Sequence, residues 1–559
     1  MVRSEQHRRK LLLPASAALL TMAIGVNALA EEEAVLRDQA LKVLGKHVFF
    51  DTALSMPKGN QACVSCHEPF AGGTSGFSDV NETTVAVPGA TGGIGNRKPP
   101  TNTYASFSPP FQPTPSTECG SATSFCGGNF WDGRSQGHPP VTDGTQPTAT
   151  AAPHLGAEVF YDIENAAILA FDQYRGPTSD QALNPMPNPV EQNISREDVC
   201  KTVQASTYSQ LYELAWGQEI NCSWETAYGT ESYFDISFKR LMLAVGAYQH
   251  SDDINSFTSK RDIALRSELA CDGESFPEHY NSSFCKKLEK SGKEPGTFPL
   301  LQLTDEENFG HDLFYGLSFT PGPGANCFIC HSNGGFGDDG TELLQTYSDH
   351  GYHNIGTPLN PQIPNGPDTG LNRHTSTLDS ADGFFKTPPI RNVAKGAKSN
   401  FTKAYTHNGY FKSVETIVHF YNTRDAKVRC ETIPELEGVE LTAEVALAND
   451  CWPAPEFPDT AAPFIIGNLG LTQEEEAALV AYIKTLEDQH TAKTPVLVKA
   501  KSFNASPIVY LFASENWSNE ICELGASADG VQPVSVTTPK NCIQFNDLLD
   551  VLGESYWLK

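Results

Sequence analysis

After its first thirty residues, the sequence lacks any apolar run of the length that a bilayer requires. Those thirty residues combine a basic start, an apolar run over 11–26 and the small-x-small motif Ala28-Leu29-Ala30, a pattern typical of a cleaved secretory signal peptide. A membrane anchor is the alternative, but the run is short and contains Pro14. We therefore predict that residues 1–30 are a signal peptide and that the protein is exported, to the periplasm or the cell surface, without a membrane span.

Basic residues are also scarce, because 39 Lys and Arg face 67 Asp and Glu and give a formal net charge of −28. Such a chain repels phosphates, which argues against nucleic-acid binding. The acidity either steers a cationic protein partner toward the surface or serves only to keep the protein soluble.

Regular helix is predicted for only part of the chain. Apolar residues at helical spacing predict helices over 34–44 and 233–249, and capping-box patterns predict that further helices start after Thr304 and Thr472. Long stretches between them are rich in Gly, Pro, Ser, Thr and Asn, and loops of that length need cofactors or disulfides to organise them. These stretches are 85–128, 134–157, 319–342 and 356–380.

Cysteine, by contrast, is abundant, with 14 residues. Four of them belong to two C-x-x-C-H motifs, and the other ten fall into five pairs of sequence neighbours. In an oxidising compartment each pair would close a local loop as a structural staple. The predicted disulfides are Cys119–Cys126, Cys200–Cys222, Cys271–Cys285, Cys430–Cys451 and Cys522–Cys542.

The two C-x-x-C-H motifs predict two covalently attached c-type haems. At this spacing two thiols can form thioethers with one porphyrin, and the adjacent histidine becomes the proximal ligand of the iron. A zinc site would usually need a second nearby Cys/His pair, and a redox C-x-x-C would need a βαβ context; neither is present. The cofactor-binding residues are Cys63, Cys66 and His67 in the first motif, and Cys327, Cys330 and His331 in the second.

Methionine and histidine are missing from the positions where a pair of electron carriers would need them. A carrier keeps its iron six-coordinate, usually with Met or His as the second axial ligand. No methionine follows Cys330, and no histidine lies between His67 and His138. Both absences argue against two ordinary Met-ligated cytochrome domains.

Several further motifs, in a fixed order from about residue 40 to residue 488, carry a family resemblance. Together with the C-x-x-C-H motifs they resemble the bacterial dihaem cytochrome c peroxidase and MauG family. The motifs are Gly45-Lys46-His47-Val48-Phe49-Phe50-Asp51, Phe130-Trp131-Asp132-Gly133-Arg134, Asn188-Pro189-Val190-Glu191, Phe385-Lys386-Thr387-Pro388-Pro389-Ile390-Arg391-Asn392 and Tyr405-Thr406-His407-Asn408-Gly409.

The resemblance implies a mainly α fold with two cytochrome-c-like haem domains and long irregular loops, and a C-terminal extension lies outside the resemblance. The expected boundaries are a peroxidatic haem domain over 31–250, a linker with a disulfide over 251–300, and an electron-transfer haem domain over 301–490. The extension, 491–559, differs in composition and has no assigned role.

The resemblance also implies roles for single residues. The haem on His67 would react with peroxide, with Glu191 as the acid/base residue and Pro185 beside it, and Trp131 would relay electrons between the haems. Without the resemblance, Trp131 would be read as a core aromatic residue and Glu191 as a solvated carboxylate.

The family also implies one calcium ion between the domains. Asn102 would be one ligand, and carbonyl oxygens near Thr387 and Pro388 would be others. Apart from the resemblance, an asparagine in a turn rich in proline and threonine is unremarkable.

Two departures from the family pattern point toward its MauG-like branch. The distal histidine of peroxidases that need reductive activation is missing after the first motif, and Thr406 replaces the usual methionine before His407. In that branch a tyrosine is the sixth ligand of the second haem. Tyr405 is the first candidate here and His407 the second, although either could serve only in packing.

The expected function is reduction of hydrogen peroxide by a haem peroxidase through high-valent iron, with electrons relayed from the second haem. The donor would be a small cytochrome or a copper protein. One alternative is a MauG-like enzyme that uses peroxide to oxidise Trp or Tyr side chains of a partner protein. The other alternative is a dihaem electron carrier without catalysis.

Overall fold

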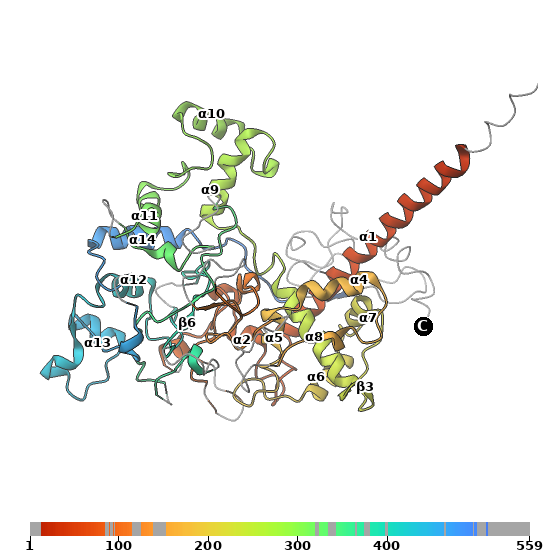
Figure 1. The fold of residues 1–559 in the computed structure, drawn as a ribbon, viewed down its shortest axis with the longest axis horizontal. Coiled ribbons are helices and arrows are strands. Elements are labelled where there is room, and N and C mark those ends of the chain that lie inside the picture. Colours follow the sequence, from red (N-terminus) through yellow and green to blue (C-terminus); the bar gives the residue numbers. More distant parts are fainter. Residues whose placement is uncertain are drawn as a thin grey trace, which may run out of the picture.

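Helices form most of the regular structure in the computed structural model of the protein (Figure 1). The α-helices are α1 (Leu13–Phe50), α2 (Cys63–Cys66), α3 (Ser78–Glu82), α4 (Ala166–Leu169), α5 (Pro177–Ala182), α6 (Arg196–Gln204), α7 (Gln210–Trp216), α8 (Tyr233–Gln249), α9 (Lys260–Leu269), α10 (Ser282–Ser291), α11 (Asp305–Tyr315), α12 (Val414–Thr423), α13 (Ala443–Ala448) and α14 (Gln473–Lys484). The structure describes residues 13–83, 86, 89, 93, 95–114, 124–137, 153–318, 324–333, 342–363, 366–373, 381–396, 401–462, 465–495, 497–499 and 510–512.

The strands are short and occur in isolated pairs. Four pairs are antiparallel, and β7 with β8 is parallel. The pairs are β1 (Gln112–Pro113) with β2 (Phe125–Cys126), β3 (Thr226–Tyr228) with β4 (Glu231–Ser232), β5 (Tyr352–His353) with β6 (Phe385–Lys386), β7 (Val428–Arg429) with β8 (Cys451–Trp452), and β9 (Leu497–Lys499) with β10 (Tyr510–Phe512).

The predicted helices are present. α8 has the predicted bounds, and α11 and α14 begin after Thr304 and Thr472, each with a complete capping box. The helix predicted over 34–44 is part of the much longer α1, since no helix-breaking residue separates it from the apolar run before it. Among the described residues, no helix combines the length and the apolarity that crossing a membrane would require.

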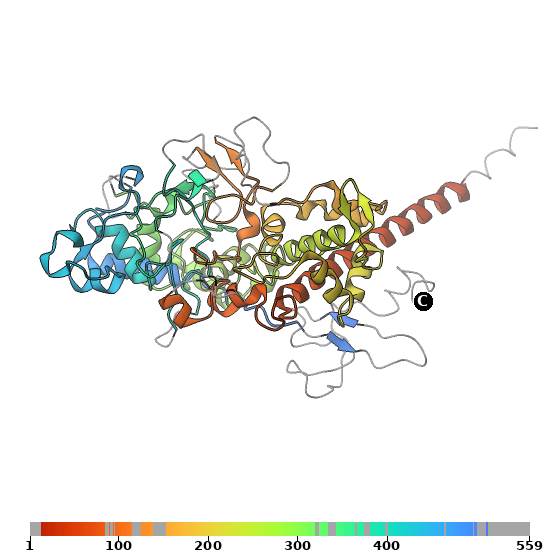
Figure 2. The ribbon, with the colours of Figure 1, turned by 90° about the horizontal axis from the view of Figure 1, so that it is seen from below.

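Two hydrophobic cores organise the described chain. The first lies between α1, α6, α7 and α8, and the second between α11, α12, α13 and α14. Figures 1 and 2 show the helices of the first core at one end of the elongated molecule and those of the second core at the other end. Between them in sequence, α9 and α10 form an arm that projects from the body in Figure 1.

The two cores share one packing feature. A Cβ atom built on Gly45 of α1 would lie 1.8 Å from the carbonyl oxygen of Ala244 in α8, and one on Gly310 of α11 would lie 2.0 Å from that of Ala478 in α14. Each glycine thus lets the helix before a C-x-x-C-H motif pack directly against a later helix. The surroundings of the two motifs are therefore alike in this respect.

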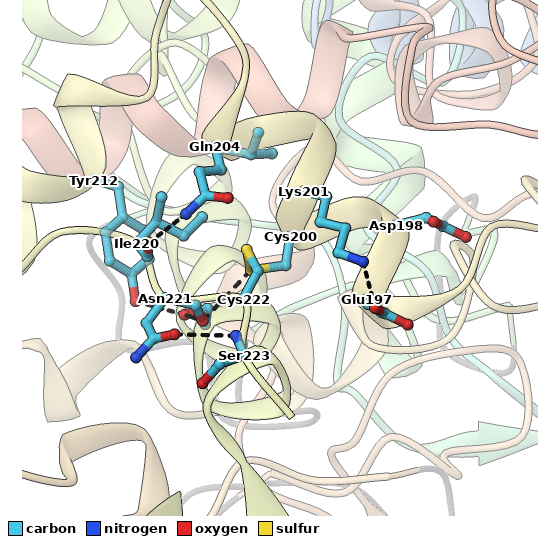
Figure 3. Close-up of a disulfide and its surroundings, with 12 residues drawn as sticks. Glu197, Asp198, Cys200, Lys201, Gln204, Tyr212, Ile220, Asn221, Cys222 and Ser223 are labelled. Atoms are coloured by element: carbon cyan, nitrogen blue, oxygen red, sulfur yellow. Dashed lines mark hydrogen bonds and ion pairs between the residues drawn. A yellow bond between two sulfur atoms is a disulfide. The ribbon is translucent and has the colours of Figure 1, made fainter. Parts of the chain in front are cut away.

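Three of the five predicted disulfides are present: Cys200–Cys222, Cys271–Cys285 and Cys430–Cys451. Figure 3 shows the first of these, which ties α6 to the segment before α8. Cys126 is also disulfide-bonded. Its predicted partner Cys119 and the pair Cys522–Cys542 lie outside the described residues.

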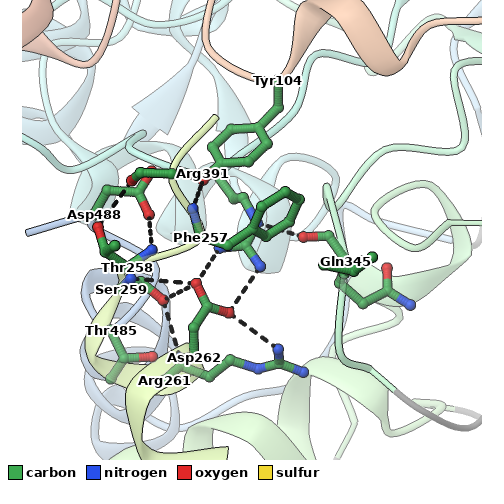
Figure 4. Close-up of polar contacts among 12 residues, drawn as sticks. Tyr104, Phe257, Thr258, Ser259, Arg261, Asp262, Gln345, Arg391, Thr485 and Asp488 are labelled. Carbon is green, nitrogen blue, oxygen red and sulfur yellow. Dashed lines mark hydrogen bonds and ion pairs between the residues drawn. The ribbon is translucent and has the colours of Figure 1, made fainter. Parts of the chain in front are cut away.

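A buried polar cluster joins segments that are distant in sequence (Figure 4). Arg391 donates hydrogen bonds to both oxygens of Asp262, at 2.6 and 2.9 Å. The hydroxyl of Tyr104 and the amide of Asn392 both donate to Asp488, at 2.7 and 2.8 Å. These bonds fix the position of the loop around residue 102 relative to the segment that contains residues 385–392.

Candidate haem sites

The first C-x-x-C-H motif places its histidine between the backbone and a cavity. Cys63 and Cys66 are the first and last residues of the short helix α2. The next residue is His67, and its Nδ1 forms a 3.0 Å hydrogen bond with the carbonyl oxygen of Gly73. Burial lowers the pKa of His67 to about 4, so the ring is neutral near pH 7. A neutral imidazole with Nδ1 bound to a carbonyl presents Nε2 as a metal ligand.

The second motif repeats this arrangement. Its cysteines lie in and directly after the short 3-10 helix η7 (Cys327–Ile329). Nδ1 of His331 shares a hydrogen bond of 3.1 Å with the carbonyl oxygen of Tyr347, and burial lowers the pKa of this histidine as well. The tautomer that binds iron through Nε2 is therefore favoured at both motifs.

Cavities at the two motifs, and motif cysteines outside disulfides, fit covalent haem. A cavity of about 380 Å³ is lined by both cysteines and the histidine of the first motif, and its volume lies in the range of about 300–1,000 Å³ typical of ligand sites. Two adjoining cavities of about 150 and 80 Å³ are lined by residues of the second motif. Among the described residues, the four motif cysteines are the ones that form no disulfide.

Glu191 and Pro185 line the first cavity together with His67, as the family resemblance implied. Burial raises the pKa of Glu191 above its usual value, and a hydrogen bond from Asn188 and the charge of Arg134 offset only part of this effect. His67 is the one histidine among the described residues that line this cavity, in agreement with the missing distal histidine.

Trp131 borders both the first cavity and the larger cavity of the second motif. Its indole N–H donates to the carbonyl oxygen of Lys98 at 2.7 Å, and its own carbonyl accepts from the amide of Lys386 at 2.9 Å. The backbone on both sides therefore holds the ring between the two haem sites.

Tyr405 and His407 both line the larger cavity of the second motif, and the two side chains differ in their polar contacts. The Tyr405 hydroxyl is buried and has no hydrogen-bond partner among the described residues, and burial raises the pKa of this phenol. His407 is engaged by Glu456, 3.0 Å from its Nε2, and its ring stacks on Phe385 at 3.5 Å.

The residues expected to bind calcium differ in how well they fit an ion. Both polar atoms of the Asn102 amide are buried without a hydrogen-bond partner among the described residues, so this side chain has an acceptor to offer. Thr387 and Pro388 line the larger cavity of the second motif, and the Thr387 carbonyl already accepts a hydrogen bond from Ser348 at 2.7 Å. Within the described ranges, no group of three or more His, Cys, Asp or Glu could hold a metal ion.

A buried ionic cluster beside Trp131 was not predicted from the sequence. Arg97 lines the first cavity and pairs with Asp132 and Asp368; its Nη1 lies 2.5 Å from Asp132 and its Nη2 2.8 Å from Asp368. Asp368 is 271 residues from Arg97, so no local pattern could indicate the pair.

Comparison with known proteins places part of the chain in a known family. A family model described as di-haem cytochrome c peroxidase matches residues 39–270. Residues 39–270 belong to this family. With the relatives below, the match makes the protein an oxidoreductase of the haem peroxidase class, and a di-haem family implies haem as its cofactor.

The chain is similar both to a MauG protein and to a cytochrome-c peroxidase. The methylamine utilization protein MauG of Paracoccus denitrificans is 26% identical over 477 residues, which are 82% of this chain and 91% of that protein. The cytochrome-c peroxidase IdrP2 of Denitromonas iodatirespirans is 24% identical over 34% of this chain and 41% of its own. The solved structure of the diheme peroxidase BthA from Burkholderia thailandensis is 20% identical, covers 81% of this chain and 87% of that chain, and has a TM-score of 0.49.

Proposed function

We propose that the protein reduces hydrogen peroxide at a haem held by His67, with electrons relayed from a second haem on His331 through Trp131. The observation that carries the proposal is the first cavity, where His67, Glu191 and Pro185 meet and Trp131 forms the border to the second site. Bound haem supplies the redox chemistry of peroxide cleavage.

The residues of the chain would provide ligation and proton transfer. Glu191 accepts the proton of the incoming peroxide and returns it to the leaving oxygen, so that water leaves instead of hydroxide. No other carboxyl group that lines the cavity in the described residues is uncommitted, because Asp132 is paired with Arg97 and Arg134. Tyr405, whose buried hydroxyl has no hydrogen-bond partner among the described residues, would help to hold the second haem.

The proposal extends to domains and location. Residues 31–250 and 301–490 would each form a cytochrome-c-like haem domain, joined by 251–300 and followed by the extension 491–559. The two separate cores support this division. Residues 1–30 would direct export to the periplasm or the cell surface, where a small cytochrome or copper protein would donate electrons.

A calcium ion at Asn102 is part of the proposal. Its buried amide oxygen lacks a hydrogen-bond partner among the described residues, which supports Asn102 as a cation ligand, with carbonyl oxygens near Thr387 and Pro388 as further donors. Metal analysis of purified protein should find about one calcium ion per chain, and Asn102→Ala should remove it while both haems stay bound. Absence of calcium from the wild-type protein would refute this part.

Glu191→Gln tests the central claim. The amide keeps the size of the side chain but cannot shuttle the proton, so steady-state peroxide turnover should fall by about 10²-fold or more. Haem content, measured by absorbance, should stay at two per chain. Glu219→Gln, an exposed glutamate, is the matched control and should retain wild-type turnover. Wild-type turnover in Glu191→Gln would exclude the mechanism.

A second candidate function is oxidation of Trp or Tyr side chains on a partner protein. The match to MauG over most of both chains and the lack of a second histidine in the described lining of the first cavity favour it. Mixing with peroxide and candidate partners, followed by mass spectrometry for oxidised aromatic residues, separates this function from peroxide removal. A mere electron carrier would show two low-spin haems by EPR, whereas both enzyme functions require one high-spin ferric haem.

A further inference from the structure

A tight turn beside the first cavity holds Glu191 through a single side chain. Asn188 lies between Pro187 and Pro189, and its Oδ1 accepts a hydrogen bond from the backbone N–H of Val190 at 3.1 Å. Its carbonyl oxygen accepts from the amide of Glu191 at 3.0 Å. An asparagine that bonds the backbone two residues later in this way stabilises a turn.

The remaining half of the Asn188 amide points at the carboxylate. Nδ2 donates to Oε1 of Glu191 at 2.7 Å. Because Oδ1 is already bound to the Val190 N–H, the amide cannot rotate to present its oxygen, so Asn188 can donate to Glu191 but cannot accept from it. This is the one hydrogen bond that the Glu191 side chain makes with the described residues.

We infer that Asn188 is a positioning residue that orients the Glu191 carboxylate toward the first haem cavity and keeps it in its proton-accepting form. The inference rests on the proposed function of Glu191 and deepens it. A donated hydrogen bond stabilises an ionised carboxylate more than a protonated one.

The other charged groups around Glu191 cannot replace this bond. Arg134 exerts an attractive charge, but both oxygens of Asp132 engage its guanidinium, at 3.0 and 3.1 Å, and it stacks over the Phe130 ring at 3.7 Å. Arg97 is neutralised by Asp132 and Asp368. The remaining charged or titratable groups in the described lining are Lys98, Arg373, His67 and the thiols of Cys63 and Cys66, which become thioethers once haem is attached.

Asn188→Asp isolates the donor function. The aspartate still accepts from the Val190 N–H, so the turn is kept, but it faces Glu191 with a like charge in place of a donor. The acid limb of the pH–rate profile for peroxide reduction should move to higher pH, with a rate about tenfold lower at a fixed pH on that limb. Asn188→Ser, whose hydroxyl preserves the turn but falls short of Glu191, should shift the limb in the same direction by less.

Unfolding of the haem-loaded protein gives a readout that is independent of activity. Near neutral pH, Asn188→Asp should lower the melting temperature more in the wild-type background than in Glu191→Gln, because the amide introduced by the second substitution can donate to the new carboxylate. A purely structural role for Asn188 predicts equal losses in both backgrounds and an unmoved acid limb, and that result would overturn the inference. If Glu191→Gln itself keeps full turnover, the proposed function fails instead, so the two failures are distinguishable.

Discussion

At the scale of single residues, Tyr405 and His407 have different surroundings although they are two positions apart. His407 is held by Glu456 and Phe385, whereas the Tyr405 hydroxyl is buried without a partner among the described residues. A buried unsatisfied hydroxyl costs roughly 1–3 kcal/mol. A bond to a bound metal would remove that cost, which favours Tyr405 over His407 as the ligand of the second iron.

Tyr405→Phe should therefore change the spectrum of the second haem. Loss of the hydroxyl would remove the proposed sixth ligand without altering the packing of the ring, so the ferric protein should show a second high-spin signal by EPR. Tyr410→Phe is the matched control, because Tyr410 is also buried but donates to the carbonyl oxygen of Leu441 at 3.0 Å. It should lower stability by about 1 kcal/mol and leave both haem signals unchanged. An unchanged spectrum in Tyr405→Phe would make His407 the preferred candidate for the ligand of the second iron.

Trp131→Phe should separate haem binding from electron relay. The smaller ring cannot make the bond to the Lys98 carbonyl, and its oxidation is harder, so electron transfer from the second haem after mixing with peroxide should slow by at least about tenfold. Rapid-mixing absorbance spectroscopy can follow the second haem directly. Trp452→Phe, which removes a buried indole of the second core bonded to Thr423, is the control and should leave this rate unaltered. Equal rates in the two variants would assign Trp131 to packing alone.

Which residues form the candidate site could be predicted only in part. The C-x-x-C-H spacing locates the proximal histidines because the chemistry itself fixes that spacing. Glu191, Trp131 and Tyr405 were indicated only by the family resemblance. Arg97 with Asp368, and the donor role of Asn188, depend on contacts that form in three dimensions, and no periodicity or motif in the sequence encodes them.

At the scale of helices, local signals predicted starts well. The capping boxes at Thr304 and Thr472 are both present because each places a Glu at the third helical position, where it reaches back to the backbone. The capping box at Ser259 has Asp262 in place of a Glu, and it was not predicted from the sequence. The close helix contacts at Gly45 and Gly310 could not be predicted from the sequence either, because each depends on a partner helix about 170 to 200 residues away in the chain.

Gly310→Ala tests the contact between α11 and α14. In an isolated helix this substitution stabilises by up to about 1 kcal/mol, but here the new methyl group would meet the Ala478 carbonyl and the Tyr482 side chain. We expect destabilisation by roughly 1–3 kcal/mol, measured by thermal unfolding. Glu306→Ala on the exposed side of the same helix should change stability by less than about 0.5 kcal/mol. A more stable Gly310→Ala protein would contradict the packing described here.

At the scale of the whole molecule, the joint between the two cores is the buried polar cluster that contains Arg391, Asp262, Tyr104 and Asp488. Arg391 with Asp262 and Tyr104 with Asp488 are 129 and 384 positions apart, respectively. The two modules could be expected from the duplicated motif, but their relative placement depends on such distant pairs, and sequence spacing carries no information about them. The same joint holds Asn102 and Trp131 close to residues 385–392, so the proposed electron relay and calcium site depend on it.

Asp262→Asn should weaken this joint in a pH-dependent way. Burial raises the pKa of Asp262, but the charges of Arg391 and Arg261 and the hydrogen bonds to the carboxylate outweigh burial and hold the pKa well below its usual range. Removing the charge leaves both arginines buried with weaker partners, so the free energy of unfolding near pH 7 should fall by roughly 3–5 kcal/mol. Asp459→Asn, at an exposed position, should change it by less than about 0.5 kcal/mol.

The sign of the pH dependence follows from the lowered pKa. A carboxyl group whose pKa is lower in the folded than in the unfolded chain contributes its full stability above the unfolded value, about 3.9 for Asp, and loses it as the pH falls toward the folded value. The wild-type protein should therefore lose this contribution below about pH 4, whereas Asp262→Asn has none to lose. Denaturant melts of the two proteins should differ most near pH 7 and converge as the pH is lowered. A difference that stays constant with pH would show that Asp262 acts through packing, not through its charge.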